Sequence, residues 1–227
     1  MTGSYIIMLL LLGFTNEQMV AQVIENKRTL RSGDDIVISC DFEPGMCGFT
    51  DDSRGEFTWL RHNGNTDTDN TGPSTDHTKG NAIGYYMYVE SSPPRETGNI
   101  ARLLSPIIHA TVPRDLHFFY HMYGKDIGTL NVYIIDLAGT ERKVWSITGD
   151  QGDKWQEVKL DLPGGNYKVV FEGIRGVGFE GDIAIDDVVI SPKVKTISAC
   201  NFENGMCGNT QDTDDDFNWQ RSHGQTV

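Results

Sequence analysis

The middle of the chain is a succession of short apolar runs separated by turn residues. The runs are rich in β-branched and aromatic residues, and they occupy residues 35–42, 82–89, 116–123, 130–135, 144–147, 155–160, 167–173 and 183–190. After the N-terminal segment, no stretch of a dozen residues carries the 3.6-residue periodicity of an amphipathic helix. Strands at this spacing, with Gly, Pro, Asn and Asp between them, predict an all-β sandwich or barrel.

One long polar segment interrupts these runs. Residues 62–81 contain almost no apolar side chains, and their Gly, Pro, Asn and Asp residues indicate several turns. We expect this segment to form a loop that faces solvent. A loop of such length in a compact domain is usually functional or mobile.

Large aromatic residues fall mostly on the predicted strands, which favours positions in the core. The residues concerned are Trp59, Phe118, Tyr120, Tyr123, Trp145, Trp155 and Phe171. Tyr85, Tyr86 and Tyr88 are harder to place, because side chains alternate between the two faces of a strand. We therefore expect at least one of these three tyrosines to be exposed and available to an interface.

Twenty-seven residues beginning at Cys40 recur from Cys200 at a constant offset of 160 residues, with fourteen identical positions. A period of this length suits a globular domain rather than a solenoid unit. We expect the chain to be part of a tandem array that is cut off at Val227. The predicted parts are one complete domain over residues 38–193, a linker over residues 194–199 and the start of a second copy over residues 200–227.

The N-terminus carries an apolar run from Tyr5 to Phe14. This run is too short to span a bilayer, which takes about 20 residues, but it has the length of the apolar part of a secretory signal peptide. We expect a signal peptide over residues 1–21 and a polar leader over residues 22–37. A buried strand or helix is the alternative for the apolar run.

The four cysteines form two pairs with the same spacing, Cys40 with Cys47 and Cys200 with Cys207. Four cysteines allow three connectivities, and the repeat favours pairing within each copy. Zinc is disfavoured, because there is no CxxC and no histidine lies at ligand spacing. Two short-loop disulfides in an oxidising compartment agree best with this pattern, which predicts an exported protein.

The formal net charge is −13 at pH 7. Such an acidic chain is not expected to bind nucleic acid or an anionic membrane surface. Its carboxylates serve solubility or bind a divalent cation, since Ca²⁺ prefers oxygen ligands. The candidate ligands are Glu43, Asp52, Asp76 and Asp187.

Asp186 and Asp187 are neighbours on a predicted strand, so their side chains should point to opposite faces. Only one of them can then join a given cation site, and we take it to be Asp187. The alternative for Glu43 and Asp187 is that they accept backbone hydrogen bonds or pair with Arg175. The sequence leaves both interpretations open.

Catalytic motifs are not evident. The chain has no HExxH, no GxSxG and no phosphate-binding P-loop. Asp76 and His77 lie close in sequence to Ser74 and Thr78, but nothing fixes a third partner for nucleophilic catalysis. We expect no enzymatic activity in this chain.

Five segments, taken together, resemble the MAM domain family, named after meprin, a neuronal antigen and receptor-type tyrosine phosphatases. They cover residues from about 38 to 193 in the family's order, and no single short motif is as specific. The segments are Cys40-Asp-Phe-Glu with Cys47-Gly, Phe57-x-Trp59, Gly72-Pro-x-x-Asp76-His77-Thr78, Phe118-x-Tyr-His-Met-Tyr-Gly124 with Ile127-Gly-Thr-Leu130, and Phe171-Glu-Gly-x-Arg175-Gly176 running to Ile185-Asp-Asp187.

The resemblance implies a jelly-roll β-sandwich, an extracellular setting and a role in adhesion through a homophilic or heterophilic protein partner. It also implies one structural cation, Ca²⁺ or Na⁺, near the acidic residues named above. Any membrane anchor is expected beyond Val227. Two other functions remain open. One is an accessory ectodomain of a membrane metalloprotease or receptor phosphatase whose catalytic domain lies outside this chain, and the other is a glycan-binding jelly roll.

The sequence departs from the family pattern at one point. Members commonly carry a second disulfide, with one cysteine just before the Phe118 strand and another after the Ile185-Asp-Asp187 strand. Here Asp115 occupies the first position, and no cysteine follows Asp187 before Cys200. Because both partners are missing together, we expect the domain to fold without this bond and to be less stable by about 2–4 kcal/mol.

Overall fold

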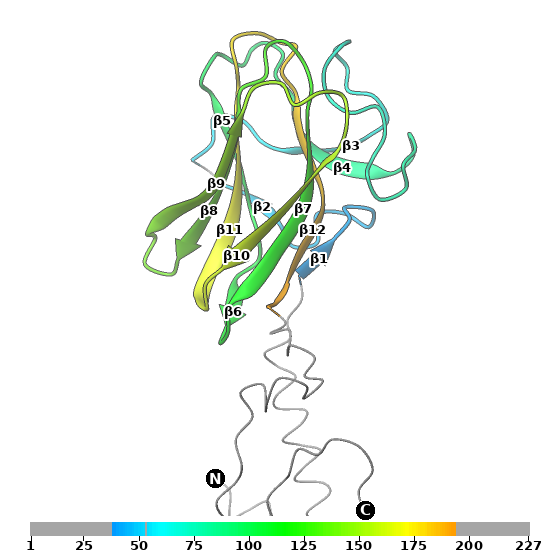
Figure 1. Cartoon of the computed structure of the whole chain (residues 1–227). Coiled ribbons are helices and arrows are strands. Elements are labelled where there is room, and N and C mark those ends of the chain that lie inside the picture. The colour runs from blue at the N-terminus through cyan, green and yellow to red at the C-terminus, as the bar shows by residue number, and fades with distance from the viewer. Residues whose placement is uncertain (1–37, 53, 194–227) are drawn as a thin grey trace, which may run out of the picture. The chain divides into compact units, whose positions relative to one another are not determined.

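The computed structural model describes residues 38–52 and 54–193, which form strands and loops (Figure 1). The strands are β1 (Ile38–Cys40), β2 (Thr50–Asp51), β3 (Leu60–Asn63), β4 (Tyr85–Val89), β5 (Ile100–Leu104), β6 (Ile108–Ala110), β7 (Arg114–Met122), β8 (Thr129–Asp136), β9 (Glu141–Thr148), β10 (Gln156–Leu162), β11 (Gly165–Ile174) and β12 (Ile183–Pro192). The predicted signal peptide, leader, linker and second copy, with the Cys200–Cys207 pair, lie outside the described residues. Within the part of the chain that the structure describes, no helix is long and apolar enough to cross a membrane.

Two antiparallel sheets face each other in a sandwich (Figure 1). Sheet A has the order β10-β7-β12-β4-β3, with β1 paired to β12, and sheet B has the order β2-β5-β11-β8-β9, with β6 paired to β11. The predicted all-β jelly-roll sandwich is confirmed. Each of the apolar runs predicted between residues 35 and 190 contributes a strand, whereas the sequence does not predict the short strands β2, β3, β5 and β6.

The first and last strands of the domain lie side by side. Strand β1 pairs antiparallel with β12, with Ile38 opposite Ile190. The chain therefore enters and leaves the sandwich at the same end, which is the lower end in Figure 1. The loops that follow β7 and β11 lie at the opposite end.

The main core fills the space between the sheets with the inward side chains of both. Trp59, Phe118, Tyr120 and Phe171 are buried there, as predicted. The rings of Phe118 and Phe171 meet edge to face with their centroids 5.0 Å apart, a geometry that adds to the energy of burial. Trp145 packs against this core from β9 and is half-buried.

A second, smaller cluster lies on the outer face of sheet A. It consists of Tyr86, Tyr88 and Ala184, with Trp155 packed against it. The rings of Tyr86 and Trp155 meet nearly perpendicularly, with centroids 5.9 Å apart. Trp155 was predicted in the main core but belongs to this cluster, and Tyr123 is likewise only half-buried.

Residues 64–84, called the covering loop below, lie over this second cluster. The Tyr86 hydroxyl donates a hydrogen bond to the Gly64 carbonyl at 2.7 Å, and the Trp155 indole N–H donates to the Thr75 carbonyl at 2.9 Å. The expectation of a solvent-facing loop is confirmed only in part: many of its residues are exposed, but Thr66, Thr71 and Asp76 are buried against sheet A.

The covering loop also determines the burial of the three neighbouring tyrosines. Tyr86 is 0 % exposed and Tyr88 is 4 % exposed, because the loop encloses the face to which they point. Tyr85 is half-buried, with the Arg61 guanidinium 3.4 Å from its ring centroid. The prediction that one of the three would be exposed was therefore wrong.

Candidate functional site

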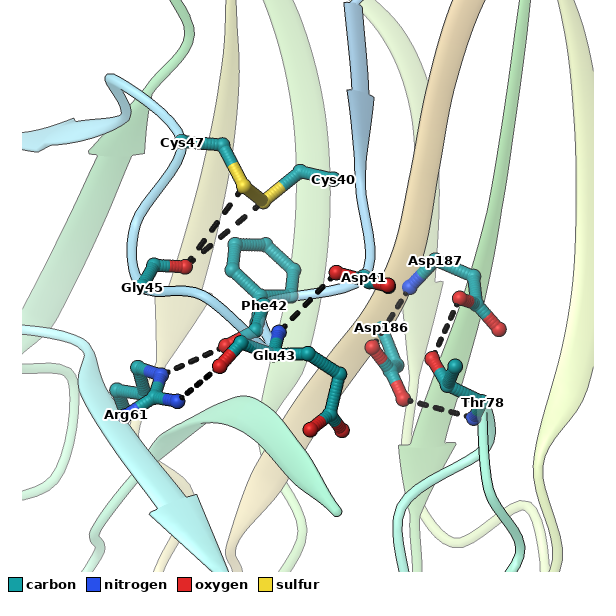
Figure 2. Close-up of a disulfide and its surroundings, with 10 residues drawn as sticks. All are labelled: Cys40, Asp41, Phe42, Glu43, Gly45, Cys47, Arg61, Thr78, Asp186 and Asp187. Carbon is teal, nitrogen blue, oxygen red and sulfur yellow. Dashed lines mark hydrogen bonds between the residues drawn. A yellow bond between two sulfur atoms is a disulfide. The ribbon is translucent and has the colours of Figure 1, made fainter.

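The disulfide between Cys40 and Cys47 closes a tight loop between β1 and β2, as predicted (Figure 2). Phe42 has a φ of 54°, a left-handed conformation that is costly for a residue with a Cβ. The Arg61 side chain holds the loop in place by donating to the carbonyls of Phe42 at 2.6 Å and Glu43 at 2.8 Å. These two hydrogen bonds fix the backbone at Glu43, the first of the predicted cation ligands.

The Glu43 carboxylate lies against the end of the covering loop. It accepts a hydrogen bond from the Tyr85 backbone N–H at 2.7 Å and forms an ion pair with Lys79. Desolvation would raise the pKa of Glu43, but the bonds from Lys79 and Tyr85 outweigh it, so the pKa is below its ordinary value. Glu43 is therefore an anion at neutral pH and links the disulfide loop to the covering loop.

Asp186 and Asp187 both face the covering loop, contrary to the alternation expected for a strand. Asp186 accepts the backbone N–H of His77 at 2.9 Å and that of Thr78 at 3.3 Å. Asp187 accepts the Thr78 hydroxyl at 2.7 Å and lies 2.5 Å from Nδ1 of His77. Figure 2 shows both carboxylates turned toward Thr78.

A β-bulge is the physical reason for this difference. The register between β12 and β7 shifts between Asp186 and Val189, and Asp187 adopts a left-handed φ of 50°. A bulge re-aims the side chain that follows it. The rule that only one of the two aspartates can join a given site was therefore wrong.

Asp186 is the most deeply buried of these carboxylates, at 0 % exposure. Burial, with a further contribution from the Asp187 charge, raises its pKa to about 7 against the hydrogen bonds that it accepts. On the outer side, the His77 ring stacks on Phe119 with centroids 3.5 Å apart. The two aspartates and Phe119 together clamp the covering loop to sheet A.

Asp76 folds the covering loop on itself. Its carboxylate is buried and accepts the backbone N–H groups of Lys79 at 2.7 Å and Asn81 at 3.1 Å. A Cβ at Gly84 would lie 2.1 Å from this carboxylate, so only glycine fits there. Asp76 thus acts as an internal cap for the tip of the loop.

Asp52, the fourth predicted cation ligand, lies at the start of a separate network on sheet B. It pairs with Arg54 at 2.6 Å and with Arg102 at 3.3 Å. The Arg54 hydrogen bond lowers the pKa of Asp52 against the effect of burial. Arg102 also binds the buried Glu172 at 2.6 Å and Glu141 at 2.9 Å, which makes this a charge network on the outer face of sheet B.

Glu43, Asp76 and Asp187 all contact residues between His77 and Tyr85, at the end of the covering loop. Asp52 lies apart from them, in the network on sheet B. Glu43 accepts a backbone hydrogen bond, in agreement with the alternative stated for it, whereas Asp187 contacts side-chain groups of His77 and Thr78. Arg175 takes no part, since its Nε donates to the Ser91 carbonyl at 2.6 Å. Among residues 38–52 and 54–193, no three His, Cys, Asp or Glu side chains form a metal-binding group, and the cation stays a prediction.

Sequence reasoning missed Asp186 and the part played by His77 and Thr78. The adjacent acids of β12 and the Asp76-His77-Thr78 motif were both recognised, but nothing in the sequence shows that the two segments meet. The contact spans about 110 residues of chain. Only the closure of the sandwich brings them together.

Taken together, the two sheets, the disulfide loop and the clamped covering loop define a disulfide-stabilised jelly-roll module of the extracellular type. The chain belongs to the MAM domain family, because residues 40–194 match the family described as MAM domain, meprin/A5/mu. This match confirms the family resemblance seen in the sequence. The module is an extracellular, cell-surface domain.

Known proteins agree with this assignment. The chain is 41 % identical over 181 residues to MAM domain-containing glycosylphosphatidylinositol anchor protein 1 of Gallus gallus, a match that covers 76 % of this chain and 19 % of the relative. It is 39 % identical over 177 residues to MAM domain-containing protein 2 of Homo sapiens, covering 77 % and 24 %. The chain thus spans about a fifth of the length of these relatives, and neither is named as an enzyme.

Among solved structures, the K1 cleaved adhesin domain of Lys-gingipain from Porphyromonas gingivalis W83 superposes with a TM-score of 0.52. The match has 18 % identity and covers 69 % of this chain and 98 % of that domain. At this identity the likeness shows the fold alone. It confirms the sandwich independently of sequence.

Proposed function

We propose that this chain is a non-enzymatic protein-interaction module that serves adhesion at the cell surface. The observation that carries the proposal is the MAM match over residues 40–194. The names of similar proteins support a surface position, since one relative is a glycosylphosphatidylinositol anchor protein. A comparable anchor in the full-length protein is part of the proposal.

The geometry supports a rigid recognition module. The covering loop is held by the Asp186 and Asp187 carboxylates, by the Trp155 indole and by the Tyr86 hydroxyl. A loop fixed in this way loses little conformational entropy when it binds a partner. The negative net charge keeps such a module soluble and steers it toward basic partner surfaces.

Sedimentation of the secreted chain tests the proposal, with one sample in calcium and one in EDTA. A dimer in calcium that dissociates in EDTA supports homophilic association through a cation-dependent surface. A dimer in both buffers supports association without a cation. A monomer at all concentrations in both buffers overturns homophilic association by this chain.

Matched variants separate the predicted cation site from general charge effects. Glu43→Gln removes a carboxylate beside the covering loop, whereas Asp52→Asn removes one on the other sheet. If the cation supports association, Glu43→Gln abolishes the calcium dependence and Asp52→Asn retains it. Equal effects of the two variants would contradict a cation site at Glu43.

A further inference from the structure

A polar cleft lies at the end of the sandwich opposite to the entry and exit of the chain. One wall is formed by residues 65, 66 and 68–74 in the first half of the covering loop, and the other by Tyr123 and Asp153. The cleft has a volume of about 230 Å³. Four hydroxyl-bearing residues, two asparagines, two aspartates and one tyrosine line it, and no Lys, Arg or His does.

The walls of this cleft are held in place before any ligand arrives. The Thr66 hydroxyl donates to the Thr71 carbonyl at 2.9 Å and closes the loop, and the Thr71 hydroxyl donates to the Tyr123 carbonyl at 2.8 Å and joins the two walls. Gly72 has a φ of 65°, and a Cβ there would lie 2.6 Å from Thr66. The loop therefore packs too tightly to collapse into the cleft.

The chemistry of the lining selects the class of ligand. With two aspartates and no basic side chain, the lining offers an anion no opposite charge. Hydroxyl and amide groups both donate and accept hydrogen bonds, whereas a guanidinium or ammonium group offers donors only. Asp153 is bonded through one oxygen to Nε2 of the buried His121 at 3.1 Å, and Asp69 supplies a second carboxylate to the lining.

We propose that this cleft binds a single neutral pyranose sugar of a glycan. Sugar hydroxyls donate and accept hydrogen bonds, which suits a lining of hydroxyl, amide and carboxylate groups. The cleft is smaller than typical ligand pockets of roughly 300–1,000 Å³. We therefore expect millimolar affinity for one sugar, increased where several modules act together.

The proposed sugar site does not lie on the face of a sheet. Tyr86 and Tyr88 on the outer face of sheet A are enclosed by the covering loop, with Tyr86 at 0 % exposure. The cleft lies instead between that loop and the end of β7. It does not depend on the adhesive role proposed above.

Saturation-transfer NMR of the secreted chain tests this inference. The probes are the methyl glycosides of glucose, galactose, mannose and N-acetylglucosamine, with arginine amide as the rival cationic probe. Asp69→Ala removes a carboxylate that lines the cleft, whereas Asp67→Ala removes an exposed one from the same loop outside the lining. We expect at least one glycoside to bind, with an affinity lowered about tenfold by Asp69→Ala and unchanged by Asp67→Ala.

Three results would overturn the inference. The first is an absence of saturation transfer from all four glycosides at millimolar concentration. The second is an equal loss in the two variants while both keep the parent unfolding temperature, which would place binding outside the cleft. The third is transfer from arginine amide alone, which would show that the cleft accepts a basic side chain and not a sugar.

Discussion

A disulfide placed where the family commonly has its second one would test the register of sheet A. Asp115 of β7 lies directly opposite Ser191 of β12. Opposed residues in antiparallel strands have Cα atoms about 4.5–5.5 Å apart, within the range of about 4.4–6.8 Å that a disulfide spans. The double variant Asp115→Cys/Ser191→Cys should therefore form a cross-strand bond without moving the backbone.

The expected gain in the free energy of unfolding follows from the length of chain that the engineered disulfide would close. A closed loop of roughly 77 residues, counted from Asp115 to Ser191, gives an entropic ceiling of about 4.5 kcal/mol, and measured values are typically about 2–4 kcal/mol. For a domain of this size such a gain raises the unfolding temperature by roughly 4–16 °C. The gain should disappear when the engineered bond is reduced.

Calorimetry of the secreted variant, with and without reductant, measures this effect. Asp115→Ser is the matched control, because it removes the same carboxylate and leaves Ser191 in place. Mass spectrometry shows whether the bond has formed. If two free thiols remain, the Asp115–Ser191 register is wrong, and if the bond forms without raising the unfolding temperature above that of Asp115→Ser, the entropic argument fails.

Three further predictions concern the covering loop and the buried charges. Trp155→Phe keeps a ring but loses the indole donor, so the free energy of unfolding should fall by about 1 kcal/mol and proteases should cut the covering loop faster; an unchanged cleavage rate would contradict the clamp. Arg102→Met removes the cation that pairs with the buried Glu172, whose remaining hydrogen bonds come from Asn131 and Tyr133. This should lower the free energy of unfolding in urea by about 3–5 kcal/mol, and a loss below 1 kcal/mol would count against the network on sheet B. Burial raises the pKa of Asp182 to about 6 and that of Asp186 to about 7, so these two carboxyl groups bind protons more tightly in the folded state than in the unfolded state. Burial lowers the pKa of His121, which therefore binds its proton less tightly in the folded state and acts in the opposite direction. In EDTA we expect the free energy of unfolding, measured in urea, to rise by about 1 kcal/mol as the pH falls from about 8 to 6. A fall in the free energy of unfolding over that window would refute these pKa directions.

The sequence predicts the strands of this fold well where they are long. Strands β7, β8, β11 and β12 have eight to ten residues each and carry apolar patterns that need no tertiary information. Strand β2 has only two residues and β6 has three. Such strands exist because a neighbouring strand supplies their hydrogen bonds, and two or three residues hold too little pattern to reveal that.

The candidate site was predicted less completely than the fold, for two physical reasons. Polar composition indicated an exposed loop over residues 62–81, but Thr71 and Asp76 are buried because their polar atoms find partners within the fold. Strand alternation separated Asp186 from Asp187, but a bulge turned both toward the loop. Composition and periodicity describe a segment in isolation, and both outcomes depend on what packs against it.

The pairing of β1 with β12 determines how this module would respond to mechanical tension. Force applied through the two ends pulls Ile38 and Pro192 apart at the open end of an antiparallel pair, so the hydrogen bonds between the strands are loaded one after another rather than together. Strand β1 has three residues and would peel away at low force. The Cys40–Cys47 bond closes its own short loop and does not tie β1 to β12. A bond between Asp115→Cys and Ser191→Cys would anchor the end of β12 to β7 but would not hold β1, so tension through Ile38 would still open the domain at β1 first.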